Sequence, residues 1–544
     1  MLINCIQSIF LDISPDEAYY YVYSKELSWG YFDHPPLVAF FIKIGYYLFN
    51  NELGVRLPFI LLSGISLILL YSIAELKKVN LFMMLSTSVV AIQVFGFQAL
   101  PDVPLIFFSL TYLLVLKKYL VADTLKLSLL LSLNIALLVL SKYHGILLIV
   151  FTLAALPHLM KRKSFWIILC STLILLAPHI YWQYTNDFAT IRFNFIERNW
   201  SAESYTISNT LVYLLIQPLI IGPFIGFLLI WSALKYKSLN EFDRVLKTIL
   251  WGVYLFFFAM TFKAGEVHPH WTIIAIVPLL ILSGKYLEQN YHRFKKTINY
   301  LFITSILFFI AGRFFLVYDF VPQSFIAHER IHGIRDWARE IQTETDNYPL
   351  VFMNSYEEAS RYTFYTNVPA ISIGNVMSRK TQFDLMNPDT CFFGNSVCVL
   401  PNWDERGFNS FTTSSGKKYR YTFLDHFVYY TKIKIEPNKN NFTVRDASEI
   451  QIPIRLVNEH YSDSDLCINP GLIPTISYHI FKNGEMVLEE RTPIKVIDVQ
   501  NTEEYFNFHI NLPEQEGEYV LKLGIACGWM PSTNNSTIIT LDIK

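Results

Sequence analysis

The sequence predicts a polytopic α-helical membrane protein with a water-soluble part at its C-terminal end. Hydrophobic residues make up 52% of the 544 residues and the mean hydropathy is +0.32, which is too apolar for a water-soluble chain of this length. The apolar runs stop near Tyr318, and the chain beyond is charged and rich in Asn and turn residues. We therefore expect a membrane domain at 1–318 and a water-soluble part after it.

Ten apolar runs are long enough, or nearly long enough, to cross a bilayer. A span needs about 20 helical residues, and the third and fourth runs are shorter than that. In chain order the runs are Val55–Leu76, Val79–Gln98, Val103–Leu116, Lys126–Leu140, His144–Met160, Ser164–Trp182, Thr210–Leu234, Leu246–Phe262, His270–Leu287 and Thr297–Tyr318. Met1–Leu11 covers only about 16 Å as a helix, so we expect either a short, incomplete first helix or a start further upstream.

Basic residues decide the expected orientation of these runs. They fall in alternate connections, at Lys77-Lys78, Lys117-Lys118, Lys161-Arg162-Lys163, Lys235 with Lys237, and Arg293 with Lys295-Lys296. The positive-inside rule assigns such connections to the cytoplasm. The other connections and the tail after Tyr318 then face the extracytoplasmic side, as in a multi-pass protein of a bacterial inner membrane.

The tail divides into two expected domains. Short buried-strand patterns alternate with helices between 319 and 430, which predicts a small α/β unit. Between 431 and 544, runs of period two separated by turns such as Lys482-Asn483-Gly484 predict an antiparallel, immunoglobulin-like β-sandwich. We interpret the sandwich as a recognition or packing module.

A polar island stands at the start of the apolar half, in Ser14–Tyr20 and Tyr31–Pro36. Carboxylates and an imidazole beside a membrane are costly to desolvate unless they are paired or used, so the island is a candidate site. A purely structural interpretation competes, because Ser14 and Glu17 have the spacing of a helix capping box. Both interpretations can hold at once.

Under the expected orientation, the outward loops collect carboxylates suited to proton transfer and cations suited to an anionic leaving group. These residues are Asp16, Glu17, Asp33, His34, Asp102, Lys142, Arg192, Arg198, Glu266, His268 and His270. The formal net charge of −1 and the absence of a long basic run argue against a nucleic-acid partner.

The order of the motifs resembles a known family. "DEAYY" at Asp16–Tyr20, "GYFDHPPL" at Gly30–Leu37 and "LPDVPL" at Leu100–Leu105 are similar to polyprenyl-phosphate-sugar-dependent glycosyltransferases of the protein O-mannosyltransferase and aminoarabinose-transferase type. The similarity continues in "SKYHG", "EVHPHW" and "SYEEASRYTFY" and covers most of residues 12–390. It implies the GT-C membrane fold and transfer of a sugar from a polyprenyl-phosphate donor to an extracytoplasmic acceptor, either a protein hydroxyl or a lipid-linked glycan.

The resemblance also implies roles for single residues. Asp16 matches the first-loop aspartate that acts as general base on the acceptor hydroxyl, and Glu17 matches its supporting neighbour. Asp33 and His34 stand near the donor phosphate, where relatives carry an acidic residue followed by lysine or histidine; a histidine there titrates near neutrality. Asp102 matches an aspartate at the head of a later helix. Lys142, Arg198, Glu266 and His270 complete the expected set of substrate contacts.

Structural alternatives remain open for several of these residues. Asp102 is equally placed to cap a helix, Lys142 to anchor a turn at the interface, and Arg198 to lie on a solvated face. His268 and His270 alternate as metal ligands sometimes do, but without a firm third partner they are a weak signal for a divalent ion. No metal or other cofactor is therefore assigned.

A transporter or lipid flippase is the alternative function, because the chain has many spans with charges near their ends. Transporters tend to show internal repeats and helices broken at the midplane, and the sequence shows no such repeat. A membrane-anchored binding module led by the sandwich is a third possibility.

Four of the six cysteines lie in the tail. If the tail faces an oxidising compartment, these thiols are favoured to pair as disulfides. We expect one disulfide between Cys467 and Cys527 inside the sandwich. A second one is expected between Cys391 and Cys398, which bracket a Gly-Asn step that can reverse the chain.

Overall fold

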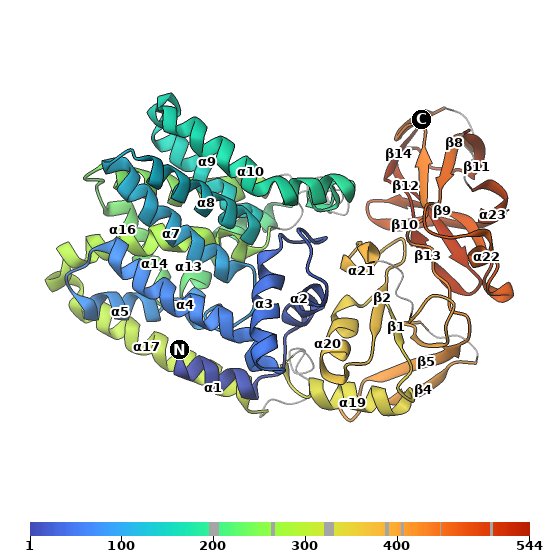
Figure 1. The fold of residues 1–544 in the computed structure, drawn as a ribbon, viewed down its shortest axis with the longest axis horizontal. Helices are drawn as coiled ribbons and strands as arrows, with labels where there is room; N and C mark the ends of the chain where they lie inside the picture. The colour runs from blue at the N-terminus through green and yellow to red at the C-terminus, as the bar shows by residue number, and fades with distance from the viewer. Residues whose placement is uncertain are drawn as a thin grey trace. The chain divides into compact units, whose positions relative to one another are not determined.

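The structure, a computed structural model, describes residues 1–194, 206–262, 267–319, 331–386, 391–403, 407–445, 448–500 and 504–544. The chain forms two compact units (Figure 1). The first contains Met1–Arg192 and Tyr205–His332, and the second contains Phe193–Ser204 and Gly333–Lys544.

The first unit is helical. Its helices are α1 (Leu2–Phe10), α2 (Pro15–Lys25), α3 (Leu37–Leu48), α4 (Glu52–Ala74), α5 (Val79–Thr87), α6 (Val90–Gln93), α7 (Asp102–Val121), α8 (Leu125–Ser141), α9 (Ile146–Ala155), α10 (Lys163–Thr185), α11 (Ala189–Arg192), α13 (Ile207–Ile221), α14 (Gly226–Lys235), α15 (Glu241–Met260), α16 (Ile276–Gln289) and α17 (Tyr291–Val317). Two 3-10 turns, η1 (Tyr143–Gly145) and η4 (Pro269–Ala275), lead into α9 and α16.

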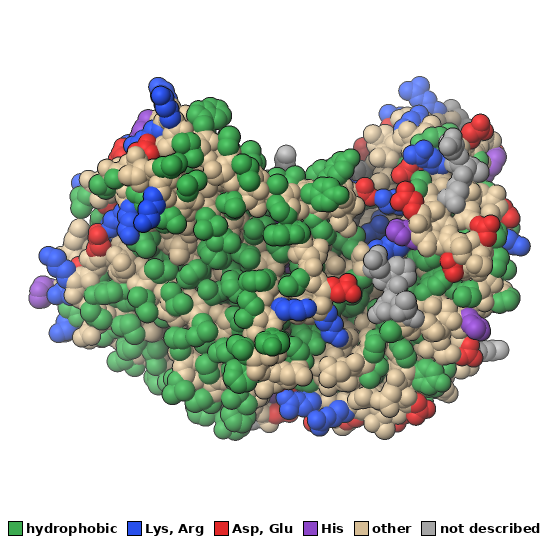
Figure 2. Space-filling model, in the orientation of Figure 1, with side chains coloured by type: hydrophobic (Ala, Val, Ile, Leu, Met, Phe, Trp, Pro, Cys, Tyr) green, Lys and Arg blue, Asp and Glu red, His purple; other side chains and the backbone are tan. Residues whose placement is uncertain are grey.

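Among the described residues, five helices are long and apolar enough to cross a membrane, or six if the bent pair α13–α14 is one span. They are α4, α7, α10, η4 with α16, and α17. The α10 and α17 helices are apolar yet mostly exposed, and Figure 2 shows hydrophobic side chains covering much of the visible face of this unit. The chain is therefore a multi-pass membrane protein, as the sequence predicts.

Ten uninterrupted spans were too many. Two predicted runs are broken, the helices at Leu125–Ser141 and Tyr143–Ala155 are shorter than a span, and α15 is not among the five. In the run at 79–98, the hydroxyls of Ser86, Thr87 and Ser88 bond back to the carbonyls of the preceding turn, which competes with the helical ladder. In the run at 210–234 the chain turns by 97° between α13 and α14, where Pro223 has no N–H to donate. The two broken segments pack against each other, since a Cβ on Gly222 would lie 2.7 Å from the Ser88 carbonyl oxygen.

The second unit begins with a mixed sheet of order β2-β1-β3-β5-β4. Its strands β1 (Leu350–Met353), β2 (Ala370–Ile373) and β3 (Val397–Leu400) are parallel, and β4 (Asn409–Thr412) and β5 (Lys418–Leu424) join antiparallel. Helices α19 (Ile334–Glu344), α20 (Tyr356–Thr366) and α21 (Gln382–Leu385) accompany the sheet. This is the predicted α/β alternation.

The rest of the unit is the predicted β-sandwich, with α22 (Asp463–Leu466) and α23 (Val496–Val499) in its connections. Its strands are β6 (Lys434–Pro437), β7 (Asn441–Val444), β8 (Glu449–Val457), β9 (Pro474–Lys482), β10 (Glu485–Lys495), β11 (Phe506–Asn511), β12 (Gly517–Cys527), β13 (Met530–Asn534) and β14 (Ile539–Ile543). One sheet has the order β10-β9-β12-β14-β7 with β13 on β12, and the other is β11-β8-β6. Pairing is antiparallel except between β14 and β7, which run parallel.

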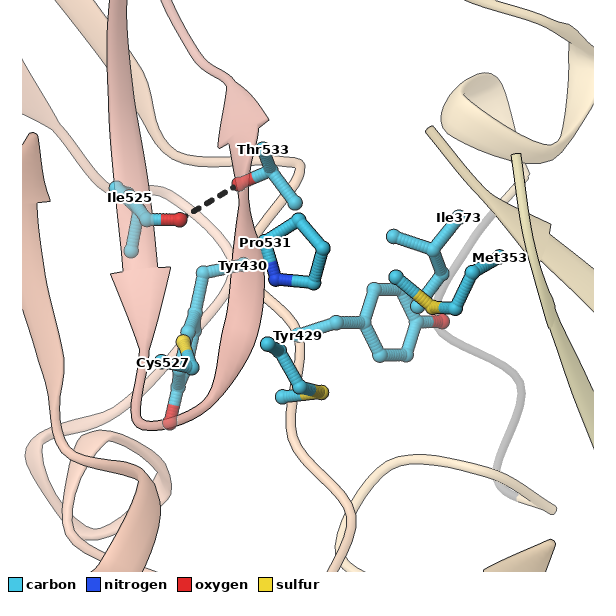
Figure 3. Close-up of a pocket in the computed structure, with 9 residues that line it drawn as sticks. Met353, Ile373, Tyr429, Tyr430, Ile525, Cys527, Pro531 and Thr533 are labelled. Atoms are coloured by element: carbon cyan, nitrogen blue, oxygen red, sulfur yellow. Dashed lines mark hydrogen bonds between the residues drawn. The ribbon is translucent and has the colours of Figure 1, made fainter. Parts of the chain in front are cut away.

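The sandwich and the α/β sheet share one hydrophobic core, which includes Val351, Val399, Ile452 and Leu521. Figure 3 shows the contact, where the β12–β13 hairpin faces Met353 and Ile373, the last residues of β1 and β2. The space between them is about 10 Å³, enough for a single water molecule. Open α/β sheets commonly bind ligands at the carboxyl ends of their strands. In this unit the hairpin packs against that edge, which favours a packing role for the sandwich.

Both predicted disulfides are wrong, because none of the six cysteines forms a disulfide. In each pair one thiol is buried in a sheet, at Cys398 in β3 and Cys527 at the end of β12, while Cys391 and Cys467 are exposed. Burial raises the pKa of the Cys398 and Cys527 thiols to about 12, so both stay protonated at neutral pH. The spacing of the cysteines along the chain does not reveal that one cysteine of each pair is buried in a strand.

His479 gives the second unit a predicted pH dependence. The imidazole is 1% exposed, contacts Ser477 at 3.2 Å, and lies near Glu489 and Arg491 of β10 and Lys522 of β12. Burial, reinforced by the two cations, lowers its pKa to about 4 from 6.5. The unfolded chain therefore binds the proton more readily between these values, so stability falls as the pH drops from 6.5 to 4.

We expect His479→Leu to remove a pH-dependent loss of about 3 kcal/mol over this window. Melting curves of the full chain in detergent at pH 4–7 measure it. His509→Leu, an exposed histidine on β11, is the matched control. Parallel pH profiles for wild type and His479→Leu would contradict the prediction.

Candidate active site

The helix α2 presents Asp16 at its start, and the local sequence explains why. Ser14 caps the helix: its hydroxyl accepts the Glu17 N–H at 3.4 Å, and its own N–H donates to Glu17 Oε2 at 3.1 Å. Pro15 occupies the first helical position, where a missing N–H costs nothing. The predicted capping box is confirmed, and it places the Asp16 side chain on the exposed side of the first turn.

Glu17 faces the opposite way and is completely buried against Arg56 of α4. Its Oε1 accepts from Arg56 Nε at 2.8 Å and from the Ala99 N–H at 3.0 Å, and its Oε2 accepts from Arg56 Nη2 at 2.7 Å. Burial alone would raise the pKa of Glu17, but the guanidinium and these hydrogen bonds hold it below its usual value. Protein donors therefore occupy both carboxylate oxygens of Glu17. Glu17 supports the structure of the site and is not open to a substrate.

Arg56 completes a clamp on the segment before Asp16. Its remaining donors bind the backbone carbonyls of Ser8 and Leu11 at 3.2 and 2.7 Å and that of Asp12 at 2.8 Å. The clamp fixes the end of α1 and the start of α2 on α4. Because Glu17 also holds Ala99, it joins this segment to the loop that carries Asp102 three residues later.

The second polar stretch is positioned by tyrosines. Tyr23 donates to Asp33 Oδ2 at 3.2 Å, and Tyr20 makes an edge contact with the His34 ring at 5.4 Å between centroids. Tyr31 stacks on Tyr23 at 4.3 Å. Asp33 and His34 are half-buried, so the loop is ordered while keeping part of both side chains accessible.

The end of α10 and the short helix α11 hold the same loop from the other side. The Thr190 hydroxyl donates to the Tyr31 carbonyl at 3.0 Å, and His179 Nδ1 lies 2.6 Å from the Trp29 carbonyl oxygen. Gly30 leaves no room for a side chain, since a Cβ there would lie 2.3 Å from the Trp182 ring. The stretch from His179 to Thr190 thus packs against the first loop.

Asp102 and Lys142 form a buried ion pair. Lys142 Nζ donates to both Asp102 oxygens, at 2.7 and 3.0 Å, and the two side chains are 7% and 6% exposed. The alternative of Asp102 as a helix cap is wrong, because Pro101 occupies the cap position and no side chain caps α7. The alternative of Lys142 as a plain interface anchor is also wrong, because the amine is turned inward onto a carboxylate.

Histidines surround this pair. Asp102 interacts electrostatically with His270 and His144, and His144 in turn with Lys142 and His34. His144 contacts Trp271, and His268 stacks on His270 at 5.7 Å. Four separate stretches, after α2, before α7, after α8 and before α16, therefore meet at one end of the membrane unit, which we call the Asp16 end.

The structure thus brings together Asp33, His34, Asp102, Lys142 and His270 from the predicted set, with Asp16 linked through Glu17. Arg198 and Glu266 lie outside the described residues. Sequence reasoning missed Arg56 and His144 as site residues. His144 could have been found in the "SKYHG" motif, whereas Arg56 lies within a predicted apolar span and gave no signal.

No group of three or more histidines, cysteines or carboxylates within the described ranges is arranged to hold a metal ion. What the site offers is an exposed carboxylate at Asp16, which is linked through Glu17 to the loop before an ion pair with several imidazoles around it. That set can accept a proton from an attacking hydroxyl and stabilise an anion on a leaving group.

Comparisons with known proteins relate the chain to sugar-transferring enzymes of membranes. A family model described as dolichyl-phosphate-mannose-protein mannosyltransferase matches residues 33–182. The lipid A galacturonosyltransferase RgtD of Rhizobium johnstonii is 24% identical over 323 residues, which is 56% of this chain and 67% of RgtD.

A solved structure shares the fold. The crystal structure of ArnT from Cupriavidus metallidurans, bound to undecaprenyl phosphate, superposes with a TM-score of 0.53 at 13% identity, over 77% of this chain and 96% of that one. The findings confirm the predicted resemblance and favour it over a transporter or flippase. The chain is a membrane glycosyltransferase with the GT-C fold that ArnT also has.

Proposed function

We propose that the protein transfers a sugar from a polyprenyl-phosphate donor to an acceptor hydroxyl on the extracytoplasmic side of the membrane. The observation that carries this proposal is the convergence of four loop stretches around the Asp102–Lys142 pair, with the exposed Asp16 linked to them through its neighbour Glu17. ArnT, which has the same fold, was solved with undecaprenyl phosphate bound, and this supports a donor of that class.

In this mechanism the Asp16 carboxylate takes the proton of the acceptor hydroxyl as its oxygen attacks the anomeric carbon. The bond from that carbon to the phosphate oxygen breaks, and the lipid phosphate leaves as an anion. His34, Lys142 and His270 supply the positive charge that receives that anion, and Asp33 helps to hold the donor. Glu17 acts through the clamp with Arg56 and keeps Asp16 in place.

We further propose that the Asp16 end and the second unit face outward. The basic residues in the connection between α4 and α5, in the last turns of α7 and in the first turns of α17 support this orientation under the positive-inside rule. The acceptor is a lipid-anchored glycan or a protein hydroxyl. A lipid A-type glycan is the first to test, because RgtD is named for that acceptor.

The experiment is a turnover assay with the purified full chain in detergent. Undecaprenyl-phosphate sugars are offered with lipid A-type glycans and with hydroxyl-bearing proteins, and release of undecaprenyl phosphate is measured. We expect release that depends on acceptor. No release from any donor with any acceptor would refute the proposed function.

Substitutions at Lys142 and Asp102 distinguish a role of this ion pair in sugar transfer from a role in stability alone. Lys142→Gln leaves the buried Asp102 carboxylate without its cation, so it should destabilise the protein; adding Asp102→Asn should restore most of that stability. If the pair serves the leaving group, the stable double variant should still lose about tenfold or more in transfer. Melting curves and donor turnover on the three variants test this, and a double variant with wild-type turnover would assign the pair a structural role only.

A further inference from the structure

A polar cluster in the membrane unit has no part in the site described above. Arg313 lies on α17, and its guanidinium donates to the side chains of Gln7 and Asn4 on α1 and to Gln93 on α6. The α1 and α17 helices contact each other and run side by side (Figure 1). We call Asn4, Gln7, Gln93 and Arg313 the Arg313 cluster.

Every acceptor that the described residues provide to Arg313 is neutral. They are the amide oxygens of Asn4, Gln7 and Gln93 and the backbone carbonyl of Gln93, while Phe97 offers its ring at 5.8 Å. No carboxylate pairs with this guanidinium among them. A cation held by dipoles alone in a lipid-facing helix keeps its full charge and attracts an anion.

The cluster also contains a hydrogen-bond donor that has no acceptor. Gln7 is 4% exposed, and its Nε2 has no hydrogen-bond partner. Because its Oε1 receives Arg313 Nη1, the amide nitrogen on the same carbon lies beside the guanidinium. A buried amide donor without an acceptor costs about 1–3 kcal/mol, and an oxyanion next to Arg313 would satisfy it.

The cluster lies near the C-terminal end of the apolar part of α17. The basic residues Arg293, Lys295 and Lys296 occupy the other end of this helix, and its apolar run ends at Tyr318. Arg313 stands five residues, about 8 Å, before that end, so its long side chain comes within reach of the boundary where lipid phosphates begin. The surface beside it is open, since Gly312 is exposed and a side chain there would meet no atom within 4 Å.

We propose that the Arg313 cluster is a binding site for the phosphate group of an anionic lipid, separate from the proposed donor site. Arg313 supplies the charge and Gln7 Nε2 supplies a neutral hydrogen bond. The phosphate belongs to either a phospholipid headgroup or a polyprenyl phosphate, since both present the same oxyanion at this depth. Gln7 lies nine residues before Asp16, so an occupant would bind next to the segment that Arg56 clamps.

Lipid-dependent stabilisation of the full chain tests the proposal. The protein is reconstituted in phosphatidylcholine nanodiscs containing phosphatidylglycerol, undecaprenyl phosphate or neither, and its melting temperature is followed against anionic lipid content. We expect Arg313→Gln to weaken the lipid affinity about tenfold or more, as expected for loss of a charged hydrogen bond. Arg293→Gln, which removes an exposed cation from the other end of α17, should bind like wild type.

The difference between the two anionic lipids identifies the source of the phosphate, and a response to either one supports the site. Because Arg313→Gln also removes four hydrogen bonds and could fail to fold, Gln7→Leu forms a second arm. It keeps the charge, removes the unused donor together with the oxygen that accepts from Arg313 Nη1, and should weaken binding several-fold. Unchanged affinity in Gln7→Leu, or in a folded Arg313→Gln, would show that the cluster only ties α17 to α1 and would overturn the proposal.

Discussion

Replacing Asp16 with asparagine is expected to lower sugar transfer about a hundredfold or more while the protein still folds and reaches the membrane. The amide keeps the shape of the side chain but cannot take a proton from the acceptor. The fold should survive because the exposed Asp16 side chain takes no part in the capping box, which uses Ser14 and Glu17.

Initial rates are measured under conditions where the chemical step limits turnover. Asp123→Asn makes the same substitution at the other end of α7 from Asp102 and should leave the rate nearly unchanged. If Asp16→Asn and wild type transfer sugar at equal rates, the base is another residue.

The second large effect is expected at Arg56, through stability rather than through chemistry. Arg56→Met leaves the Glu17 carboxylate fully buried with its cation gone, and removes the donors to the carbonyls of Ser8, Leu11 and Asp12. Breaking one partner of a buried ion pair costs about 3–5 kcal/mol. The start of α2 should loosen with it, so transfer should fall as well.

Melting curves and hydrogen exchange at the start of α2 report the two effects. Arg293→Met removes an exposed arginine of the same unit and should change neither. Should Arg56→Met melt at the temperature of this control, the clamp does not stabilise the loop.

Local patterns predicted the elements whose causes are also local. The capping box of Ser14 and Glu17 depends on a spacing of three residues, and the sandwich on alternation within single strands such as β9. The family motifs, each short, indicated which stretches meet at the Asp16 end. These features could be derived because the residues that cause them stand beside each other in the chain.

Features that depend on distant partners could not be predicted in this way. Arg56 lies 39 residues from Glu17, inside a run whose average is apolar. The break between α5 and α6 comes from three hydroxyls that a hydropathy average ignores, and it packs on Gly222 of the other break. The cysteine pairs were predicted from spacing, but burial of Cys398 and Cys527 in strands decides their state.

A structure of the full chain with an undecaprenyl-phosphate sugar bound is the decisive measurement, since it shows the donor and the base together. We expect the phosphate within hydrogen-bonding reach of His34, Lys142 or His270, with the anomeric carbon open toward Asp16. A donor phosphate bound away from all three of these residues, or a sugar that turns its anomeric carbon away from Asp16, would contradict it.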